Sequence, residues 1–179
     1  PTPAMKADWA ERDAWGYGFR TGQRVTGPGD HHWIQAKNRP ISDSGGWSIV
    51  VDGLPSRRYD DADGPYFSTD GHQVAYWAKE RQHEWEYIVV NGKPGAAFAE
   101  IKGPIWSAGR SAAFTPVTNR VIYKAMRRMR WHAVIDLDPG PACEWIGDID
   151  IAADGRSIGY PGIVVDGIYW IVRQVETSG

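Results

Sequence analysis

Short stretches of hydrophobic residues recur along this chain, and turn-forming residues separate them. Val, Ile, Tyr and Trp dominate these stretches, and β-branched and aromatic side chains are typical of β-strands. The 21 Gly and 12 Pro residues are spread along the chain, which indicates many short elements. Only positions 119–130 approach the periodicity of a helix. The pattern predicts an all-β protein, whose clearest strands run from Trp47 to Val51, Val74 to Trp77, Trp85 to Val90, Val121 to Tyr123, Trp131 to Ile135 and Ile168 to Val172.

One ten-residue pattern occurs three times. It reads FSTDGHQVAY from Phe67, FTPVTNRVIY from Phe114 and IAADGRSIGY from Ile151. Each copy places a tyrosine nine residues after its first hydrophobic residue and another hydrophobic residue two places before that tyrosine. A weaker copy, FRTGQRV, runs from Phe19 to Val25. Self-similarity at a fixed spacing is the signature of a repeat architecture.

A tryptophan follows each copy and begins a further strand. Trp47, Trp85, Trp131 and Trp170 are separated by 38, 46 and 39 residues. Three of these strands run into Asp or Asn, as in WSIVVDG, WEYIVVNG and WHAVID, and these residues favour a tight reversal. A short fourth strand is expected after each reversal, at Arg57 to Asp60, Ala96 to Ala99 and Ala142 to Trp145.

Four antiparallel strands in about 40 residues are typical of a β-propeller blade. One such sheet cannot bury both faces alone, so neighbouring sheets must cover each other. The last copy lacks a fourth strand, and we expect the segment from Lys6 to Glu11 to close the ring by pairing with the last blade. The prediction is one domain, 1–179, forming a small propeller of four blades of four antiparallel strands at about 15–61, 65–101, 104–146 and 149–176.

The stretch from Phe67 to Gly95, FSTDGHQVAYWAKERQHEWEYIVVNGKPG, resembles the repeat of the WD-like, TolB-type bacterial β-propellers. The similarity covers about positions 47–175 and is weak over 15–39. It is interrupted where Pro116 to Thr118 replaces the Asp-Gly turn and where Pro161 to Gly167 is inserted. In that family the repeat specifies a scaffold, found both in partner-binding modules and in domains attached to enzymes. The resemblance therefore implies the fold and leaves the activity open.

Composition excludes several classes of protein. The 20 basic and 22 acidic side chains leave a net charge of −2, so no overall field favours nucleic-acid binding. No apolar run approaches the roughly 18 residues of a membrane-spanning helix. Cys143 is the single cysteine, so an internal disulfide is impossible. The first residues do not follow the pattern of a signal peptide, and we expect a cytoplasmic protein, with the periplasm or secretion as alternatives.

Aromatic and acidic residues near the predicted strand ends are the first candidates for binding. The four tryptophans that recur with the repeat are expected to fill the gaps between neighbouring sheets. Trp106 falls near a predicted turn, where an exposed indole could dock a partner or stack on a sugar. Two acidic groups lie between repeats and are expected on the loops that connect blades: Asp61 and Asp63, and Asp148 and Asp150.

A cluster of basic residues follows the second copy of the pattern. Its members align with the second strand and hairpin of the preceding repeat, so we interpret the segment as a hairpin rather than a helix. It is either a solvated hairpin or a docking patch for an acidic protein surface or a phosphate-bearing ligand. The cluster comprises Arg120, Lys124, Arg127, Arg128 and Arg130, of which Arg127 and Arg128 are the candidates for partner binding.

Sequence signatures of catalysis are missing. The chain has no nucleophile elbow, P-loop, dinucleotide-binding fingerprint or H-E-x-x-H motif. His31 and His32 follow each other directly, and adjacent residues of an extended chain point in opposite directions, so a shared metal ion is not predicted. No catalytic residue, metal site or cofactor is predicted.

The leading hypothesis is a non-catalytic binding module that presents the loops of a propeller face to a protein partner. Its candidate residues are Asp61, Asp63, Trp106, Arg127, Arg128, Asp148 and Asp150. The alternative is a carbohydrate-binding or small-ligand-binding protein, which could be a hydrolase that uses carboxylates near the propeller axis. Either a monomer or a homo-oligomer is compatible with the sequence.

Overall fold

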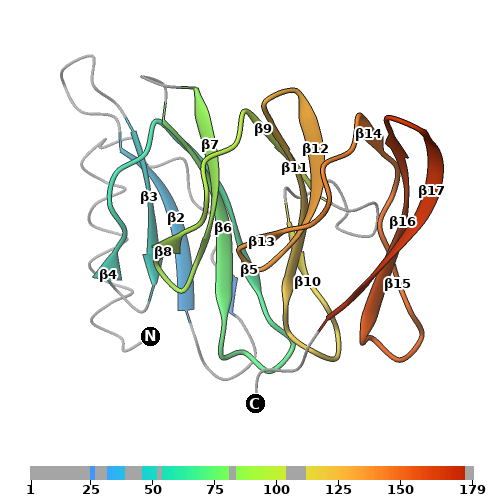
Figure 1. Ribbon diagram of the computed structural model, residues 1–179. Helices are drawn as coiled ribbons and strands as arrows, with labels where there is room; N and C mark the ends of the chain where they lie inside the picture. The colour runs from blue at the N-terminus through green and yellow to red at the C-terminus, as the bar shows by residue number, and fades with distance from the viewer. Residues whose placement is uncertain are drawn as a thin grey trace.

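The computed structural model describes residues 25–26, 32–38, 46–51, 54–80, 84–103 and 112–175. These residues form strands and turns without a helix, which confirms the all-β prediction. They build four antiparallel sheets, one after another along the chain. Figure 1 shows the sheets standing side by side, from β2 to β4 at one end to β16 and β17 at the other.

The first two sheets have the same strand order, in which each strand pairs with the next one in the chain. The first sheet contains β1 (Val25–Thr26), β2 (His32–Asn38), β3 (Gly46–Val51) and β4 (Leu54–Pro55). The second contains β5 (Asp61–Phe67), β6 (Val74–Glu80), β7 (Trp85–Val90) and β8 (Lys93–Pro94).

In the third and fourth sheets the first strand is split into two short pieces that pair with the same neighbour. The third sheet contains β9 (Glu100–Lys102), β10 (Ala113–Phe114), β11 (Val121–Arg127), β12 (Arg130–Ile135) and β13 (Asp138–Pro139). The fourth contains β14 (Trp145–Ile146), β15 (Asp150–Ile151), β16 (Ser157–Val164) and β17 (Gly167–Gln174).

The predicted fourth strands are present in the first three sheets. After each tight turn the chain pairs back onto the third strand, through the bridges Trp47–Tyr59, Glu86–Phe98 and Trp131–Cys143. In the third sheet the bridging residue is therefore Cys143, and the aromatic residue expected there, Trp145, begins β14 instead. Within the described residues, the outer edge of β17 has no such fourth strand.

The basic segment forms the hairpin that the repeat alignment predicts. β11 and β12 pair from Ile122 opposite Ile135 to Arg127 opposite Arg130. Arg128 and Met129 form the turn with positive φ angles of 52° and 62°, the conformation that tight hairpins require.

The alignment of the weakest copy is wrong. Val25 lies in the first strand of its sheet, not in the second as the FRTGQRV match predicts. Ile34 of β2 pairs with Val50, just as Tyr76, the tyrosine of the ten-residue pattern, pairs with Val89 in the second sheet. Ile34 therefore occupies the tyrosine position in the first sheet. The N-terminal part of this copy, from Phe19, lies outside the described residues.

The recurring tryptophans divide into two pairs. Trp47 and Trp131 pack against buried clusters between neighbouring sheets, as predicted. Trp85 and Trp170 are exposed, so the prediction is wrong for them. Glu86, not Trp85, bridges to the fourth strand as Trp47 and Trp131 do, and a shift of one residue along a strand turns a side chain to the opposite face.

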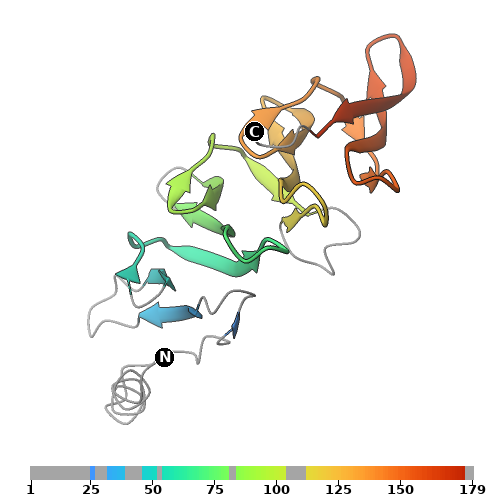
Figure 2. The same ribbon diagram turned by 90° about the horizontal axis from the view of Figure 1, so that it is seen from below.

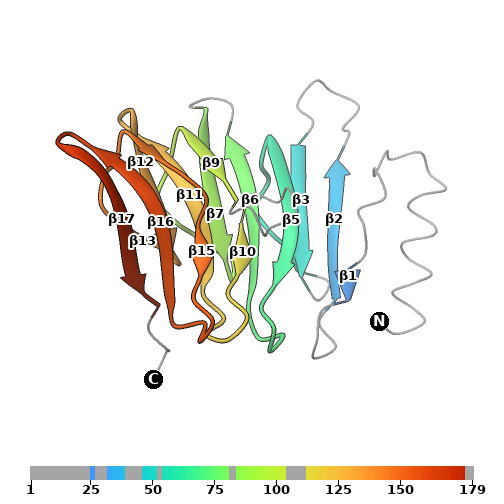
Figure 3. The ribbon, with the colours of Figure 1, turned by 90° about the vertical axis from the view of Figure 1, so that its right-hand side faces the viewer.

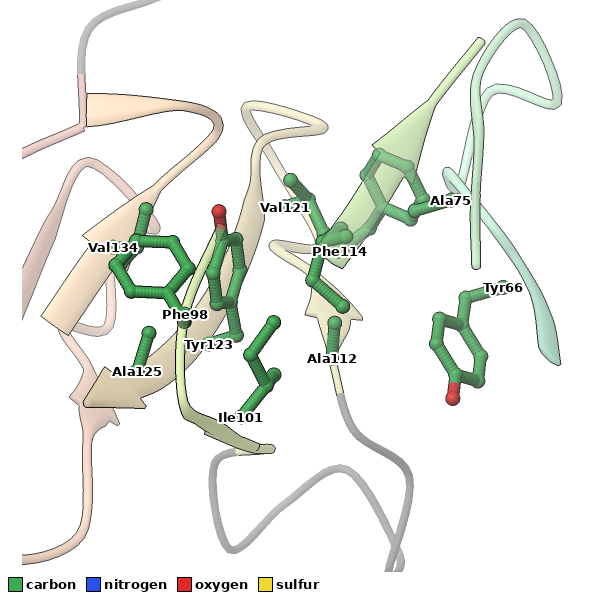
Figure 4. Close-up of a cluster of buried hydrophobic side chains, with 11 residues drawn as sticks. Tyr66, Ala75, Phe98, Ile101, Ala112, Phe114, Val121, Tyr123, Ala125 and Val134 are labelled. Atoms are coloured by element: carbon green, nitrogen blue, oxygen red, sulfur yellow. The ribbon is translucent and has the colours of Figure 1, made fainter. Parts of the chain in front are cut away.

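Neighbouring sheets interlock through three clusters of buried hydrophobic side chains. Figure 4 shows the cluster between the second and third sheets. In it the rings of Phe98 and Tyr123 pack edge to face, with their centroids 6.2 Å apart. Burying one large hydrophobic side chain contributes about 1.5–3 kcal/mol, so these clusters hold successive sheets together.

The four sheets form an open row. Figures 2 and 3 place the first and fourth sheets at opposite ends, with the second and third between them. The segment from Lys6 to Glu11 lies outside the described residues, so closure of the ring by that strand remains a prediction.

Candidate functional site

The predicted acidic pair at Asp61 and Asp63 lies in a strand, not in a loop. Asp61 pairs with Lys79 across the sheet, so β5 begins earlier than the repeat pattern predicts. The carboxylate of Asp63 accepts a hydrogen bond from the hydroxyl of Tyr66 at 2.5 Å, and Asp61 accepts one from the amide of Ala62 at 3.0 Å. Both aspartates remain exposed to solvent.

The second acidic pair lies around the split first strand of the fourth sheet. Asp148 lies between β14 and β15, and Asp150 lies within β15 opposite Gly159. The carboxylate of Asp148 is 3.5 Å from the ammonium group of Lys124. This contact joins one predicted acidic residue to one member of the predicted basic cluster. Trp106 lies outside the described residues.

The basic cluster is spread over both ends of the hairpin, and most of its charges are paired. Lys124 pairs with Asp148, as described above. The other two pairs are Arg120 with Asp136 at 2.6 Å and Arg130 with Glu144 at 2.9 Å. Arg127 and Arg128 are exposed at the turn, and neither makes an ion pair with any residue in the described ranges. The predicted docking patch is therefore reduced to two arginines.

The described residues also form an exposed apolar surface that the sequence analysis did not predict as a site. It is the outer face of the fourth sheet, the face turned away from the third sheet. Its exposed members are Trp145 (49%), Ile168 (75%), Trp170 (60%) and Val172 (57%). The register places them together, since Trp145 and Ile168 both lie opposite Ile163, and Trp170 lies opposite Pro161. Among the described residues of this face, Asp150 is the charged side chain, opposite Gly159.

Equivalent positions in the other sheets are buried. The pairing register matches Trp170 with Ile88 of the second sheet and Ala133 of the third, and both are fully buried under the next sheet. Val172 corresponds to Ile135, which is 9% exposed. The fourth sheet therefore keeps the apolar character of an interface but has no following sheet within the described residues.

Both indoles of this face lie close against neighbouring residues of the sheet. A Cβ atom added to Gly159 would lie 2.8 Å from the indole of Trp170, so that ring lies directly over the glycine backbone. A Cβ atom on Gly147 would lie 2.5 Å from Pro161 and 2.9 Å from the indole of Trp145. Two indoles lying against small residues make a broad apolar plate, which suits the packing of another sheet.

A second candidate is the cavity of about 340 Å³ between the first and second sheets. Its lining is mostly apolar, with a few polar groups, which is typical of small-ligand pockets. Lining residues include Val51, Leu54, Ser56, His72, Tyr76 and Asn91.

The cavity is open because of one turn residue. At the next interface, Leu137 projects against Gly95, whose added Cβ would lie 2.8 Å from the Leu137 side chain. The pairing register shows that Gly92 is the residue of the second sheet equivalent to Leu137 of the third. A Cβ atom added to Gly92 would have no atom within 4 Å. At the interface of the third and fourth sheets, Arg173 fills the corresponding space beside Gly140.

Three tyrosines occupy the same repeat position at the three interfaces. Burial raises the pKa of Tyr76, Tyr123 and Tyr160, in the case of Tyr160 to about 12. The Tyr76 hydroxyl interacts with Tyr59 and Ser56. In contrast, the hydroxyls of Tyr123 and Tyr160 are buried with no hydrogen-bond partner in the described part of the chain.

The described residues offer little for catalysis or metal binding. Burial raises the pKa of the Cys143 thiol, which disfavours the reactive thiolate. No group of three or more His, Cys, Asp or Glu side chains within the described ranges is arranged to hold a metal ion. The part of the chain that the structure describes contains no helix long and apolar enough to cross a membrane.

Comparisons with known proteins support the fold and give no information about activity. No protein-family model matches the chain, and no curated protein matches it in sequence. Among solved structures it is similar to the β-propeller domain of the Trilobed protease from Pyrococcus furiosus, which has an open Velcro topology. The TM-score is 0.52 at 12% identity, over 90% of this chain and 56% of that domain.

This similarity supports the predicted β-propeller fold. It does not extend to the WD-like, TolB-type family, to the number of blades or to ring closure. The chain spans just over half the length of the solved domain. An identity of 12% carries no information about activity.

Proposed function

We propose that this chain is a non-catalytic interaction module that binds a protein partner. The observation that carries the proposal is the outer face of the fourth sheet, where Ile168, Trp170 and Val172 are exposed at positions that are buried elsewhere. Large exposed apolar patches mark interaction sites on soluble proteins, and tryptophan is among the residues that contribute most to binding.

The exposed charged residues named by the sequence analysis form a second, weaker contact region in this proposal. Arg127 and Arg128 project from the hairpin turn and can attract an acidic partner, while Asp61, Asp63, Asp148 and Asp150 can attract a basic one. Trp106 belongs to the same sequence-based hypothesis. Charges at a rim change association rate and salt dependence more than affinity, so the apolar face is expected to dominate.

Capture of partners by the immobilised chain tests this function. The double variant Trp170→Lys/Val172→Lys should lose a protein that the native chain retains from an extract of the source cells. The matched control is Val117→Lys/Met129→Lys, since both residues are exposed and lie in turns of the third sheet. Identical sets of captured proteins for native and outer-face variants would contradict the proposal.

Small-ligand binding is the second candidate, and the cavity beside Gly92 favours it. The cavity volume falls within the range of small-molecule sites, and Ser56, His72 and Asn91 add polar groups to its apolar wall. A nuclear magnetic resonance screen with small aromatic and carbohydrate fragments tests this candidate. Amide shifts should gather at Gly71 and Gly92 and spare the interface that Leu137 fills. Shifts that appear nowhere, or equally at Gly95, would refute it.

A further inference from the structure

The cavity between the first and second sheets occupies a position that the chain itself fills at its other two junctions. Three residues mark this position, because each donates its backbone amide to an equivalent strand carbonyl: Ser56 to Ile49, Gly95 to Ile88 and Gly140 to Ala133. Between the second and third sheets, Leu137 lies against Gly95. Between the third and fourth, Arg173 lies against Gly140. Beside Ser56 a cavity of about 340 Å³ remains, so the first junction offers to another molecule the space that side chains fill elsewhere.

The size and the walls of the cavity determine the apolar part of a ligand. Val51, Leu54 and Val74 supply apolar walls. The volume of about 340 Å³ lies near the lower end of the range for ligand sites, roughly 300–1,000 Å³. At the next junction the same position accepts the branched aliphatic side chain of Leu137. A small ligand with a branched aliphatic group would therefore reproduce a contact that the chain already makes.

Uncharged residues replace an ion pair at this junction. In the third sheet, Asp136 pairs with Arg120 at 2.6 Å. The pairing register and the ten-residue pattern place Asn91 and Gln73 at the equivalent positions of the second sheet. Among the described residues that line the cavity, none is a lysine, arginine, aspartate or glutamate. A charged ligand would lose its hydration here without gaining an ion pair, so the ligand is expected to be uncharged.

Asn91 determines the polar part of a ligand. Its side-chain carbonyl accepts a hydrogen bond from the amide of Val74 at 3.0 Å, so its amino group is the end that can donate to a ligand. Asp136 accepts the equivalent hydrogen bond from Val121 but has no amino group. The polar atom of the ligand is therefore expected to be an acceptor, such as a carbonyl oxygen.

We propose that this cavity binds a small uncharged molecule that combines a branched aliphatic group with a carbonyl oxygen. The inference rests on small-ligand binding, the second candidate of the proposed function, and names the ligand class. The branched group takes the place that the Leu137 side chain has at the next junction, and the carbonyl oxygen accepts a hydrogen bond from the Asn91 amino group.

Four capped amino acids test the ligand class in nuclear magnetic resonance titrations of the isotope-labelled chain. N-acetyl-leucinamide has both features and should shift the amides of Gly71 and Gly92 in a saturable way. N-acetyl-leucine adds a carboxylate, N-acetyl-alaninamide lacks the branched group, and N-acetyl-phenylalaninamide replaces it with a ring. The dissociation constants of these three probes should be higher by about tenfold or more, because each departs from the ligand class in one feature.

Two variants of the cavity test the same assignment on the chain. Asn91→Asp keeps the acceptor for Val74 but removes the amino donor, and it should weaken binding of N-acetyl-leucinamide about tenfold, as expected for one lost hydrogen bond. Leu54→Asp replaces an exposed apolar wall residue with a charge and should weaken binding by a similar factor. The control Met129→Asp changes a similarly exposed residue away from the cavity and should bind like the native chain. Thermal melting of each variant checks that it folds.

The outcomes separate the ligand class from small-ligand binding itself. Tighter binding of N-acetyl-leucine or N-acetyl-phenylalaninamide than of N-acetyl-leucinamide would overturn the inference and leave small-ligand binding in place. Native affinity in the folded variants Asn91→Asp and Leu54→Asp would also overturn it. If the fragment screen shifts Gly71 and Gly92 but N-acetyl-leucinamide does not, the ligand class alone fails. Shifts from neither would refute small-ligand binding as well.

Discussion

Two sheet faces built from the same repeat position differ in their exposure to solvent. Around Ile88 the second sheet is sealed by the third, whereas around Trp170 the fourth sheet is open to solvent. Both faces are apolar and both have regular strand pairing, so strand chemistry alone does not decide burial. Burial is decided by whether another sheet covers the face. This difference separates the residues that stabilise the fold from those that are available for binding.

Truncation of Ile88 should give the largest effect. Ile88→Ala removes fully buried methylene and methyl groups from the cluster between two sheets and should lower the free energy of unfolding by about 2–5 kcal/mol. Trp170→Ala should lower the free energy of unfolding, measured by urea unfolding, by less than about 1 kcal/mol because its side chain is mostly exposed. Equal losses in the two variants would mean that Trp170 is a core residue.

Alkaline pH should weaken the sealed interfaces next. Tyr160 has a pKa of about 12 in the folded chain, above its ordinary value of 10, because burial disfavours the phenolate. The resulting stabilisation is complete below pH 10 and is lost as the pH rises toward 12, by at most about 1.4 kcal/mol per pH unit.

Urea unfolding of native chain and Tyr160→Phe between pH 8 and 12 isolates this contribution. The native chain should lose stability more steeply than the variant above pH 10. Some slope should remain in the variant, since burial also raises the pKa of Tyr76 and Tyr123. Parallel curves for the two proteins would refute the assignment to Tyr160.

Removing a tyrosine hydroxyl should change the free energy of unfolding in opposite directions at two of the buried interfaces. Tyr123→Phe eliminates a buried hydroxyl that has no partner in the described residues and should stabilise the fold by about 1 kcal/mol. Tyr76→Phe removes the contacts with Tyr59 and Ser56 and should destabilise it by about the same amount. Thermal unfolding gives both values, and a loss of stability in Tyr123→Phe would show that its hydroxyl is satisfied.

The hairpin turn should contribute least. Arg127→Glu/Arg128→Glu changes two exposed side chains without an ion pair in the described ranges and should alter the free energy of unfolding by less than about 0.5 kcal/mol. If the turn helps to bind an acidic partner, capture of that partner should weaken and lose its salt dependence. A variant that melts well below the native chain would place these arginines in the fold rather than at a binding site.

Most of the strand order could be predicted from the sequence, because it depends on local signals. Trp and β-branched residues mark the third strands, and turn residues mark their ends, as β3, β7 and β12 confirm. Errors arose where the pattern leaves the register free by one residue. Trp85 matched the repeat in spacing, yet Glu86 occupies the bridging position.

The candidate site was harder to predict, because exposure depends on neighbours that the local sequence does not specify. Trp170 recurs with the repeat, and that spacing predicted a side chain buried between neighbouring sheets. Asp61 and Asp63 looked like loop residues, yet cross-strand pairing with Lys79 and Trp77 extends β5 through them. The cavity beside Gly92 was missed, although the difference between Asn-Gly and Asp-Leu at equivalent turns was its visible signal.

That turn has a practical consequence for engineering. The side chains of Asn91 and Asp136 accept equivalent hydrogen bonds from the backbone amides of Val74 and Val121, each at 3.0 Å. Val74 and Val121 begin the second strands of their sheets, so this hydrogen bond is an anchor that the two turns share. Exchanging Leu137 for glycine would carve a hollow beside Gly95 without disturbing that anchor. A chain of such repeats could thus be given recesses at chosen junctions, one residue at a time.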